Sequence, residues 1–178
     1  MYPIALDLSR IRIVLVGSGE AAARRMQQLK EAGTTHITPY LSQLPEAHEI
    51  RQAHVLLVVG LDDETSTVLA SIARLQGILV NVEDKPELCD FYFTSFVKRG
   101  DLMLAVSTNG ASPTLAQEIK AHLAKEFGEE WEEIVSEIAA ERLKWKKSGC
   151  DNKTVGERTR ALITARELLS PAPEHENA

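Results

Sequence analysis

A short glycine-rich segment is the first place in this chain where residue types and spacing could do chemistry. In the letters VGSGEAAARR, Gly17 and Gly19 follow an apolar run, and Ala22 comes shortly after them. In a strand-to-helix turn, the first glycine permits a tight turn and the second lets the backbone approach a pyrophosphate, while a small third residue allows close packing. The helix N-terminus would then hold the phosphates. The same letters also fit a tight turn without a ligand.

The acidic residue that usually binds the ribose of a dinucleotide is missing from its expected place. An Asp or Glu about 20 residues beyond the glycines is typical of such sites. Here the second expected strand ends at Thr38, Pro39 and Tyr40, and Glu46 comes only later. The choice between NAD and NADP therefore stays open. Arg24 and Arg25 lie on the first expected helix, where we favour a solvated surface.

A second segment, residues 81–113, places many polar groups between two apolar runs. Asp84 closes the first run, and a polar loop ending in Ser-Pro follows the second. From the residues alone, Asp84 has two interpretations. It caps the following Lys-Pro turn as an ordinary Asx-turn residue, or it lies at the carboxyl end of a parallel strand, where open α/β sheets bind ligands.

Alternating strands and helices must position these residues. Apolar runs at residues 11–16, 54–60 and 78–83 predict strands buried on both faces, and a shorter strand is expected at 36–39. Helices are expected at 20–32 and from Asp62 or Asp63 to about 76, because strong helix formers are followed there by glycine. This alternation predicts an α/β fold with a Rossmann-type, doubly wound parallel sheet.

The pattern changes from residue 91 onward. Residues 91–98 and 102–108 predict two antiparallel strands joined by a tight turn at Gly100. Ser112 and Pro113 predict the start of a helix over 113–127, and further helices are expected at 130–146 and 154–169. We therefore expect a nucleotide-binding domain with the strand pair at 1–111, a helical region at 112–170 that supplies a dimer interface and part of a substrate pocket, and a disordered tail at 171–178.

The bulk composition argues against several classes of protein. The chain has 178 residues and a net charge of −6, whereas nucleic-acid binders usually present a basic face. Cys89 and Cys150 lie far apart, and neither they nor the histidines have metal-ligand spacing. No apolar run approaches membrane-spanning length, and no signal peptide is recognised. We expect a cytoplasmic protein with no metal site and no nucleic-acid or membrane partner.

Three segments together resemble one known family. They are IALDLSRIRIVLVGSGEAAARR at residues 4–25, NVEDKPELCDF at 81–91 and VKRGDLMLAVSTNGASPTLAQEIKAHL at 97–123. Their order and spacing are similar to those of the siroheme-synthase N-terminal-type precorrin-2 dehydrogenase/sirohydrochlorin ferrochelatase family. The resemblance implies a Rossmann domain that binds NAD, a small dimerisation segment and a C-terminal helical region, working as a homodimer. It also implies NAD-dependent oxidation of precorrin-2 to sirohydrochlorin in siroheme biosynthesis, with ferrous iron insertion in some members.

The resemblance also implies the site residues. Asp84 falls at the position of the family's catalytic aspartate, and a carboxylate can take the proton that accompanies hydride transfer. The candidate cofactor-binding residues are Gly17, Ser18, Gly19, Glu20, Ala22, Gly60, Asp62 and Val82. Because the tetrapyrrole substrate carries many carboxylates, cations and amide groups are expected around it. The candidate substrate-binding residues are Lys98, Arg99, Thr108, Asn109, Gly110 and Ser112. Lys98 and Arg99 fit a charged hairpin turn equally well.

Two departures from the family pattern leave other functions open. The connection between the second expected strand and residues 54–60 is short, and the family's AATDD stretch reads VGLDD here, at residues 59–63. One alternative is therefore a metal chelatase that has lost dehydrogenase activity. The other is a non-catalytic protein that binds a tetrapyrrole or a nucleotide.

Overall fold

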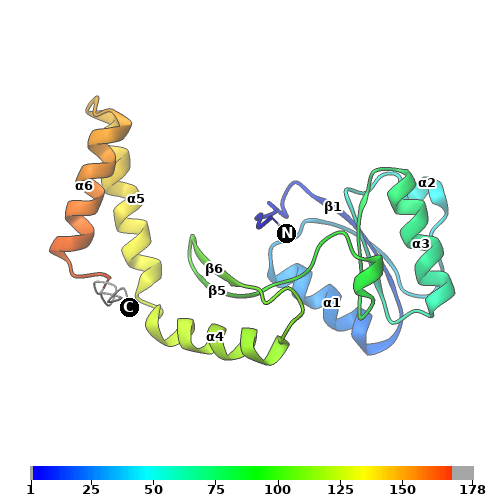
Figure 1. Ribbon diagram of the computed structural model, residues 1–178. Coiled ribbons are helices and arrows are strands. Elements are labelled where there is room, and N and C mark those ends of the chain that lie inside the picture. Colours follow the sequence, from blue (N-terminus) through cyan, green and yellow to red (C-terminus); the bar gives the residue numbers. More distant parts are fainter. Residues whose placement is uncertain (1, 170–178) are drawn as a thin grey trace. The chain divides into compact units, whose positions relative to one another are not determined.

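The computed structural model describes residues 2–169 and divides the chain into two compact units, one ending at Phe93 and the other beginning at Thr94 (Figure 1). The sequence predicts a boundary near residue 111, after the strand pair. In the structure the strand pair belongs to the second unit, because both of its strands pack on the helix that follows them. The tail expected at 171–178 lies outside the described residues.

The first unit is built on a parallel sheet of four strands in the order β2-β1-β3-β4. The strands are β1 (Arg12–Gly17), β2 (His36–Tyr40), β3 (Val55–Val59) and β4 (Leu79–Val82). β1 is central, since its Leu15 pairs with Pro39 of β2 on one side and Leu57 of β3 on the other. The order therefore reverses between β1 and β3, and ligands bind at such reversal points in open α/β sheets.

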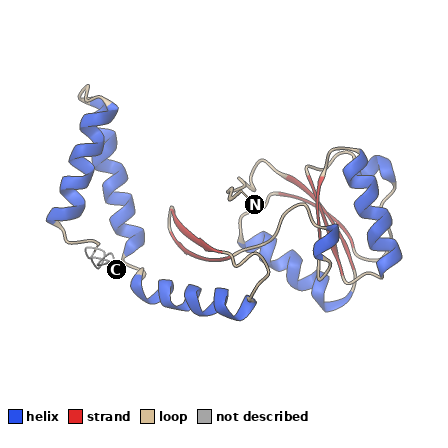
Figure 2. Cartoon of the chain, viewed as in Figure 1, coloured by secondary structure: helices blue, strands red, loops and turns tan. Residues whose placement is uncertain are grey.

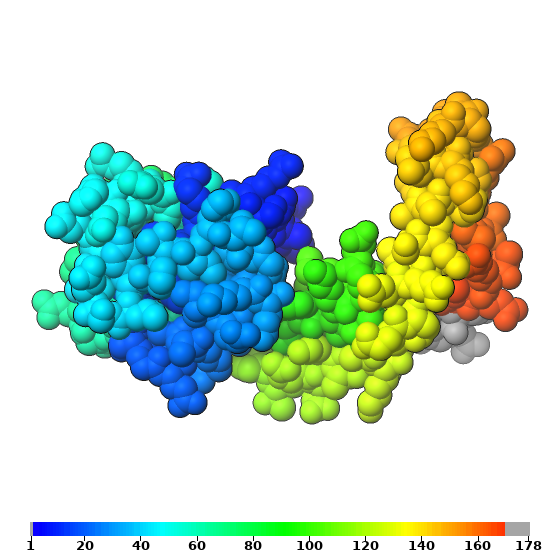
Figure 3. Space-filling model, turned by 180° about the vertical axis from the view of Figure 1, so that it is seen from behind, coloured from blue at the N-terminus to red at the C-terminus, as the bar shows by residue number. Residues whose placement is uncertain are grey.

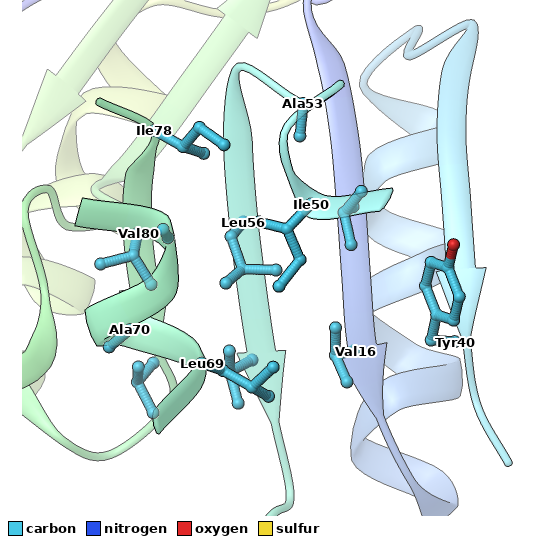
Figure 4. Packing of buried hydrophobic residues seen from close by; sticks show 13 residues of the cluster. Val16, Tyr40, Ile50, Ala53, Leu56, Leu69, Ala70, Ile78 and Val80 are labelled. Carbon is cyan, nitrogen blue, oxygen red and sulfur yellow. The ribbon is translucent and has the colours of Figure 1, made fainter. Parts of the chain in front are cut away.

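Helices cover both faces of this sheet (Figure 2), which confirms the doubly wound prediction. They are α1 (Gly19–Glu31), α2 (Ala47–Ile50), α3 (Asp63–Leu75) and the 3-10 turn η1 (Pro86–Leu88). On one face Ala22 and Leu29 of α1 pack against alternate residues of β1 and β3. On the other face α2 and α3 cover Val16, Leu56 and Val80 (Figure 4). Burying both faces explains why these strands read as continuous apolar runs.

Two features of the first unit differ from the sequence-based expectation. The short connection after β2 contains the unexpected helix α2, whose Ile50 is fully buried in the core. The strand expected at 91–98 begins later, at Ser95. Phe91 instead packs against the α1 face of the sheet, and its carbonyl oxygen accepts a bond from Asn81 Nδ2 at 2.8 Å. Residues 91–93 are therefore held by the first unit and do not extend the strand.

The second unit combines a hairpin with three helices. The antiparallel strands are β5 (Ser95–Arg99) and β6 (Leu102–Val106), and the helices are α4 (Pro113–Glu126), α5 (Trp131–Lys147) and α6 (Asn152–Ala165). α5 and α6 lie side by side (Figure 3). Ser112 caps α4, since its Oγ accepts a bond from the backbone N of Leu115 at 3.2 Å, as the Ser-Pro pair predicted. Within residues 2–169, no helix has both the length and the apolar character needed to cross a membrane.

Candidate active site

The glycine turn lies at the reversal point of the first unit's sheet, directly after β1. A Cβ atom on Gly17 would lie 2.5 Å from the carbonyl oxygen of Val59 and 3.0 Å from the Cβ of Ala22. The first contact requires movement of the backbone, and the second is tighter than nearly all real Cβ contacts. Glycine at position 17 and a small residue at position 22 therefore let β1, β3 and α1 approach closely, as expected for this type of turn.

The next residues leave the N-terminus of α1 open to a ligand. Ser18 is extended and does not cap the helix, because its Oγ donates to the carbonyl oxygen of Gly60 at 3.1 Å. Gly19 has a φ of 66°, which favours glycine, and a Cβ there would meet nothing within 4 Å. The first N–H groups of α1 thus have no side-chain cap from Ser18, and there is room beside Gly19, which fits a dinucleotide pyrophosphate. Glu20 is exposed in the same turn, where its backbone N–H is the group suited to a phosphate.

The remaining candidate cofactor residues lie at the ends of β3 and β4, and they have different surroundings. Gly60 lies beside the glycine turn, since a Cβ on it would be 3.1 Å from the carbonyl oxygen of Ser18. Asp62 caps α3, because its carboxylate accepts bonds from Thr65 N and Thr65 Oγ1, both at 2.8 Å. These two bonds, the backbone one first, lower the pKa of Asp62. Val82 is buried in the core. Asp62 and Val82 therefore stabilise the elements around the site and do not present free side chains to a cofactor.

Asp84 occupies a strained and exposed position in the turn after β4. The backbone N of Lys85 donates to the carbonyl oxygen of Val82 at 3.3 Å, and Asp84 has a φ of 61°. This left-handed conformation costs a non-glycine residue about 1–2 kcal/mol, although aspartate tolerates it better than most. Within residues 2–169 the Asp84 carboxylate has no hydrogen-bond partner, so the bond that an Asx-turn would require is absent. Its side chain is exposed at the carboxyl end of the sheet.

Neighbouring side chains fix the backbone on either side of Asp84. Glu83 forms an ion pair with Arg25 of α1 at 3.2 Å, and the Arg25 guanidinium lies over the ring of Phe93. Arg25 is thus only 18% exposed, unlike the solvated residue that the sequence suggested. Cys89 Sγ accepts a bond from Val82 N at 3.3 Å, and burial raises the pKa of this thiol. The thiol therefore supports packing of the turn.

The two cations of the hairpin in the second unit have different surroundings. Arg99 is 15% exposed, and its Nε and Nη2 donate to the carbonyl oxygens of Phe127 at 3.0 Å and Ala124 at 3.3 Å. These bonds satisfy carbonyl groups at the C-terminus of α4, where a cation is also favoured by the helix dipole. Lys98, by contrast, is exposed on the strand opposite Met103. Only Lys98 retains a side chain that is open to solvent.

The polar loop before α4 is a tight turn with an exposed tip. Thr108 Oγ1 accepts a bond from Ser112 N at 3.1 Å and donates to Ser112 O at 3.0 Å, which closes the loop. Asn109 and Gly110 both have positive φ, and Ala111 N donates to Thr108 O at 2.9 Å. Asn-Gly is the favoured pair for such a turn. Thr108 and Ser112 hold the loop, while Asn109 and Gly110 are exposed.

These features together define a class of protein. A parallel sheet that reverses its order at a glycine turn, with an open helix N-terminus above the reversal, is a Rossmann-type dinucleotide-binding fold. The chain belongs to the family described as "Putative NAD(P)-binding", whose profile matches residues 4–95. The profile described as "Sirohaem biosynthesis protein central" matches residues 99–126. Both the predicted family and its dinucleotide cofactor are confirmed.

Curated relatives and solved structures agree with this assignment. A siroheme synthase of Methylococcus capsulatus is 30% identical over an alignment of 178 positions, and this alignment covers 82% of this chain and 38% of the relative. A siroheme synthase of Chromobacterium violaceum is 36% identical over 140 residues, covering 68% of this chain and 30% of the relative. The chain thus spans well under half the length of these relatives. A structure named "SirC, precorrin-2 dehydrogenase" matches with a TM-score of 0.70 at 21% identity, covering 96% of this chain and 93% of that one, which supports the fold.

Proposed function

We propose that the protein oxidises precorrin-2 to sirohydrochlorin with NAD, as a step of siroheme biosynthesis. The observation that carries this proposal is the state of Asp84, which is exposed, strained and without a hydrogen-bond partner among residues 2–169. It lies at the carboxyl end of a sheet whose reversal point carries the glycine turn. Backbone strain of this kind clusters at active sites. The names of the siroheme synthase relatives and of the SirC structure support the choice of substrate.

The proposed reaction removes one hydride and one proton from the macrocycle, which is a two-electron oxidation. When bound, NAD supplies the nicotinamide ring that accepts the hydride. The N–H groups at the start of α1 would hold its pyrophosphate, with Gly19 leaving room for it. The carboxylate of Asp84 accepts the proton, as a general base does. The hydrogen bond from Lys85 N to Val82 O stabilises the turn that contains Asp84.

The second unit supplies groups that suit a substrate with many carboxylates. Lys98 presents an exposed ammonium, and Gly110 at the exposed tip of the loop offers a backbone N–H, whereas Asn109 N already donates to Ser107 Oγ at 3.2 Å. Arg99 contributes indirectly, because it fixes the end of α4. If the protein also inserts ferrous iron, the pyrrole protons must leave the macrocycle, and Asp84 is suited to accept them as well.

We also propose that the protein is a homodimer that uses the outer face of the hairpin. Phe96 and Met103 are 47% and 49% exposed on this face. Leu115 and Ile119 of α4 are also large exposed apolar side chains. Apolar side chains grouped on a surface mark interaction sites. A second copy of the chain would cover Phe96 and Met103.

The variant Asp84→Asn tests the proposed function. Asparagine adopts the left-handed conformation as readily as aspartate, so the turn is preserved while the charge is lost. We expect the thermal midpoint and the Kd for NAD to be unchanged, while anaerobic turnover of precorrin-2 falls by about 100-fold or more. Glu64→Gln, at an exposed position on α3, is the matched control and should keep full activity. Undiminished turnover in Asp84→Asn would exclude this carboxylate from the reaction.

A further inference from the structure

The side chain of Lys85 is a largely buried cation next to the candidate catalytic residue. It is 16% exposed, and its Nζ contacts Asp63 Oδ1 at 2.8 Å, Ser66 Oγ at 3.0 Å and the carbonyl oxygen of Leu61 at 3.2 Å. Ser66 is fully buried. A lysine ammonium has three N–H donors, so these acceptors can use its whole capacity. Because a buried charge is costly unless it is paired, the side chain is fixed in this position.

These contacts connect two loops that are far apart in the sequence. Lys85 belongs to the turn after β4, whereas Leu61 lies in the loop after β3 and Ser66 in the first turns of α3. The backbone of Lys85 is fixed as well, since its N donates to Val82 O at 3.3 Å and its carbonyl oxygen accepts a bond from Leu88 N at 3.0 Å. Asp84 therefore directly precedes a residue that is held at both its backbone and its side chain.

The connection extends from the turn of Asp84 to the glycine turn. Leu61 directly follows Gly60, whose carbonyl oxygen accepts the bond from Ser18 Oγ at 3.1 Å. Ser18 N in turn donates to Val59 O at 3.3 Å. One continuous set of bonds thus runs from Lys85 through the loop after β3 to the residues that precede α1. Moving the Lys85 side chain would loosen the candidate base and the candidate phosphate site together.

We propose that Lys85 is a positioning residue that couples the Asp84 turn to the dinucleotide site, and this proposal rests on the proposed function of that site. Lys85 does not itself face the reacting groups, because its ammonium group is turned toward Leu61, Asp63 and Ser66. It sets the position of the Asp84 carboxylate and of the loop beside Ser18. Misplacement of about 1 Å at such a site can cost about 100-fold in rate.

The test compares Lys85→Met, which removes the ammonium and keeps the length of the side chain, with the wild type. We expect the Kd for NAD to rise by about tenfold, because this corresponds to the free energy of roughly one charged hydrogen bond. The kcat for precorrin-2 should fall by about 10- to 100-fold, while its KM stays unchanged. Amide hydrogen exchange should become faster at residues 61–66 and 83–86. Lys30→Met, at an exposed position on α1, is the matched control and should match the wild type.

A second variant separates positioning from a loss of folding. Ser66→Ala removes only the buried hydroxyl that Lys85 contacts, and it should cause the same changes to a smaller extent. If Lys85→Met no longer unfolds cooperatively, Ser66→Ala carries the test alone. Wild-type NAD affinity and wild-type exchange rates in a folded Lys85→Met or Ser66→Ala protein would overturn the proposal. NAD titration and hydrogen exchange need no precorrin-2, so a wild type that binds NAD without oxidising precorrin-2 would refute the proposed function alone.

Discussion

Replacing Gly17 by alanine tests the packing that creates the dinucleotide site. The added Cβ would lie 2.5 Å from the carbonyl oxygen of Val59 and 3.2 Å from the Cβ of Val59. The first contact is with backbone, so β1 and β3 must separate or the turn must shift. Gly17 does not have a positive φ. The cost of the methyl group is therefore steric and does not come from an unfavourable backbone conformation.

The sign of the effect on stability is diagnostic. Gly→Ala at an unstrained position stabilises a protein by about 0.4–1 kcal/mol through the unfolded state. Overpacking a well-packed site costs about 1–3 kcal/mol, and we expect this term to dominate at position 17. A change of 1 kcal/mol shifts the Tm of a 60–100-residue domain by about 4–8 °C. The first unit ends at Phe93, so its Tm should fall by several degrees.

The assay is thermal unfolding followed by circular dichroism, with and without NAD. Saturation at about 100 times the Kd stabilises a protein by about 2.7 kcal/mol, and this NAD-dependent rise in Tm should be present in the wild type. It should shrink in Gly17→Ala, because the shifted turn disturbs the bond from Ser18 N to Val59 O. Gly77→Ala is the control, since Gly77 has a positive φ but no neighbour within 4 Å of a Cβ. It should lower Tm without changing the NAD effect. A Gly17→Ala protein with an equal or higher Tm would refute the steric argument.

Three further predictions follow from single contacts. Arg99→Ala should destabilise the second unit by about 1–3 kcal/mol, because the carbonyl groups of Ala124 and Phe127 lose a charged donor; an unchanged denaturation midpoint would contradict this. The bonds from Thr65 lower the pKa of Asp62 in the folded state below the unfolded value of about 3.9. These bonds therefore stabilise the folded protein above that pH, and the stabilisation is lost as the pH falls through the folded-state pKa. The difference in Tm between wild type and Asp62→Asn should therefore narrow between about pH 5 and pH 2, and a constant difference would exclude the linkage. Phe96→Lys should convert a dimer to a monomer in sedimentation equilibrium, and an unchanged mass would remove the hairpin face from the interface.

The elements that the sequence predicted well are those specified by local interactions. The β3 run, the Asp62 cap and the Ser112 cap depend on neighbouring residues, and each is present in the structure. Helix α2 was missed because a helix of four residues has little local signal and depends on the burial of Ile50. The extent of the strand near Phe91 was overestimated because its contacts come from the fold of the first unit.

The partners of the charged side chains could not be read from the sequence. Arg25 pairs with Glu83 across a separation of 58 residues, which no local pattern reports. Arg99 binds carbonyl groups that become available only when α4 ends beside it. Lys85 was treated as part of a turn, and its acceptors come together only when the loops after β3 and β4 meet. The glycine turn, by contrast, was recognisable because its strand and its helix are adjacent in the chain.

The most direct test of the proposed function is an anaerobic reaction of the wild-type protein with enzymatically generated precorrin-2 and NAD. NADH absorbance and the sirohydrochlorin spectrum are followed together, before any ferrous iron is added. We predict that both products form in equal amounts and far faster than in a control without protein. Supplied sirohydrochlorin that is metallated faster with the protein than without it, in the absence of any precorrin-2 oxidation, would contradict the account and indicate a chelatase.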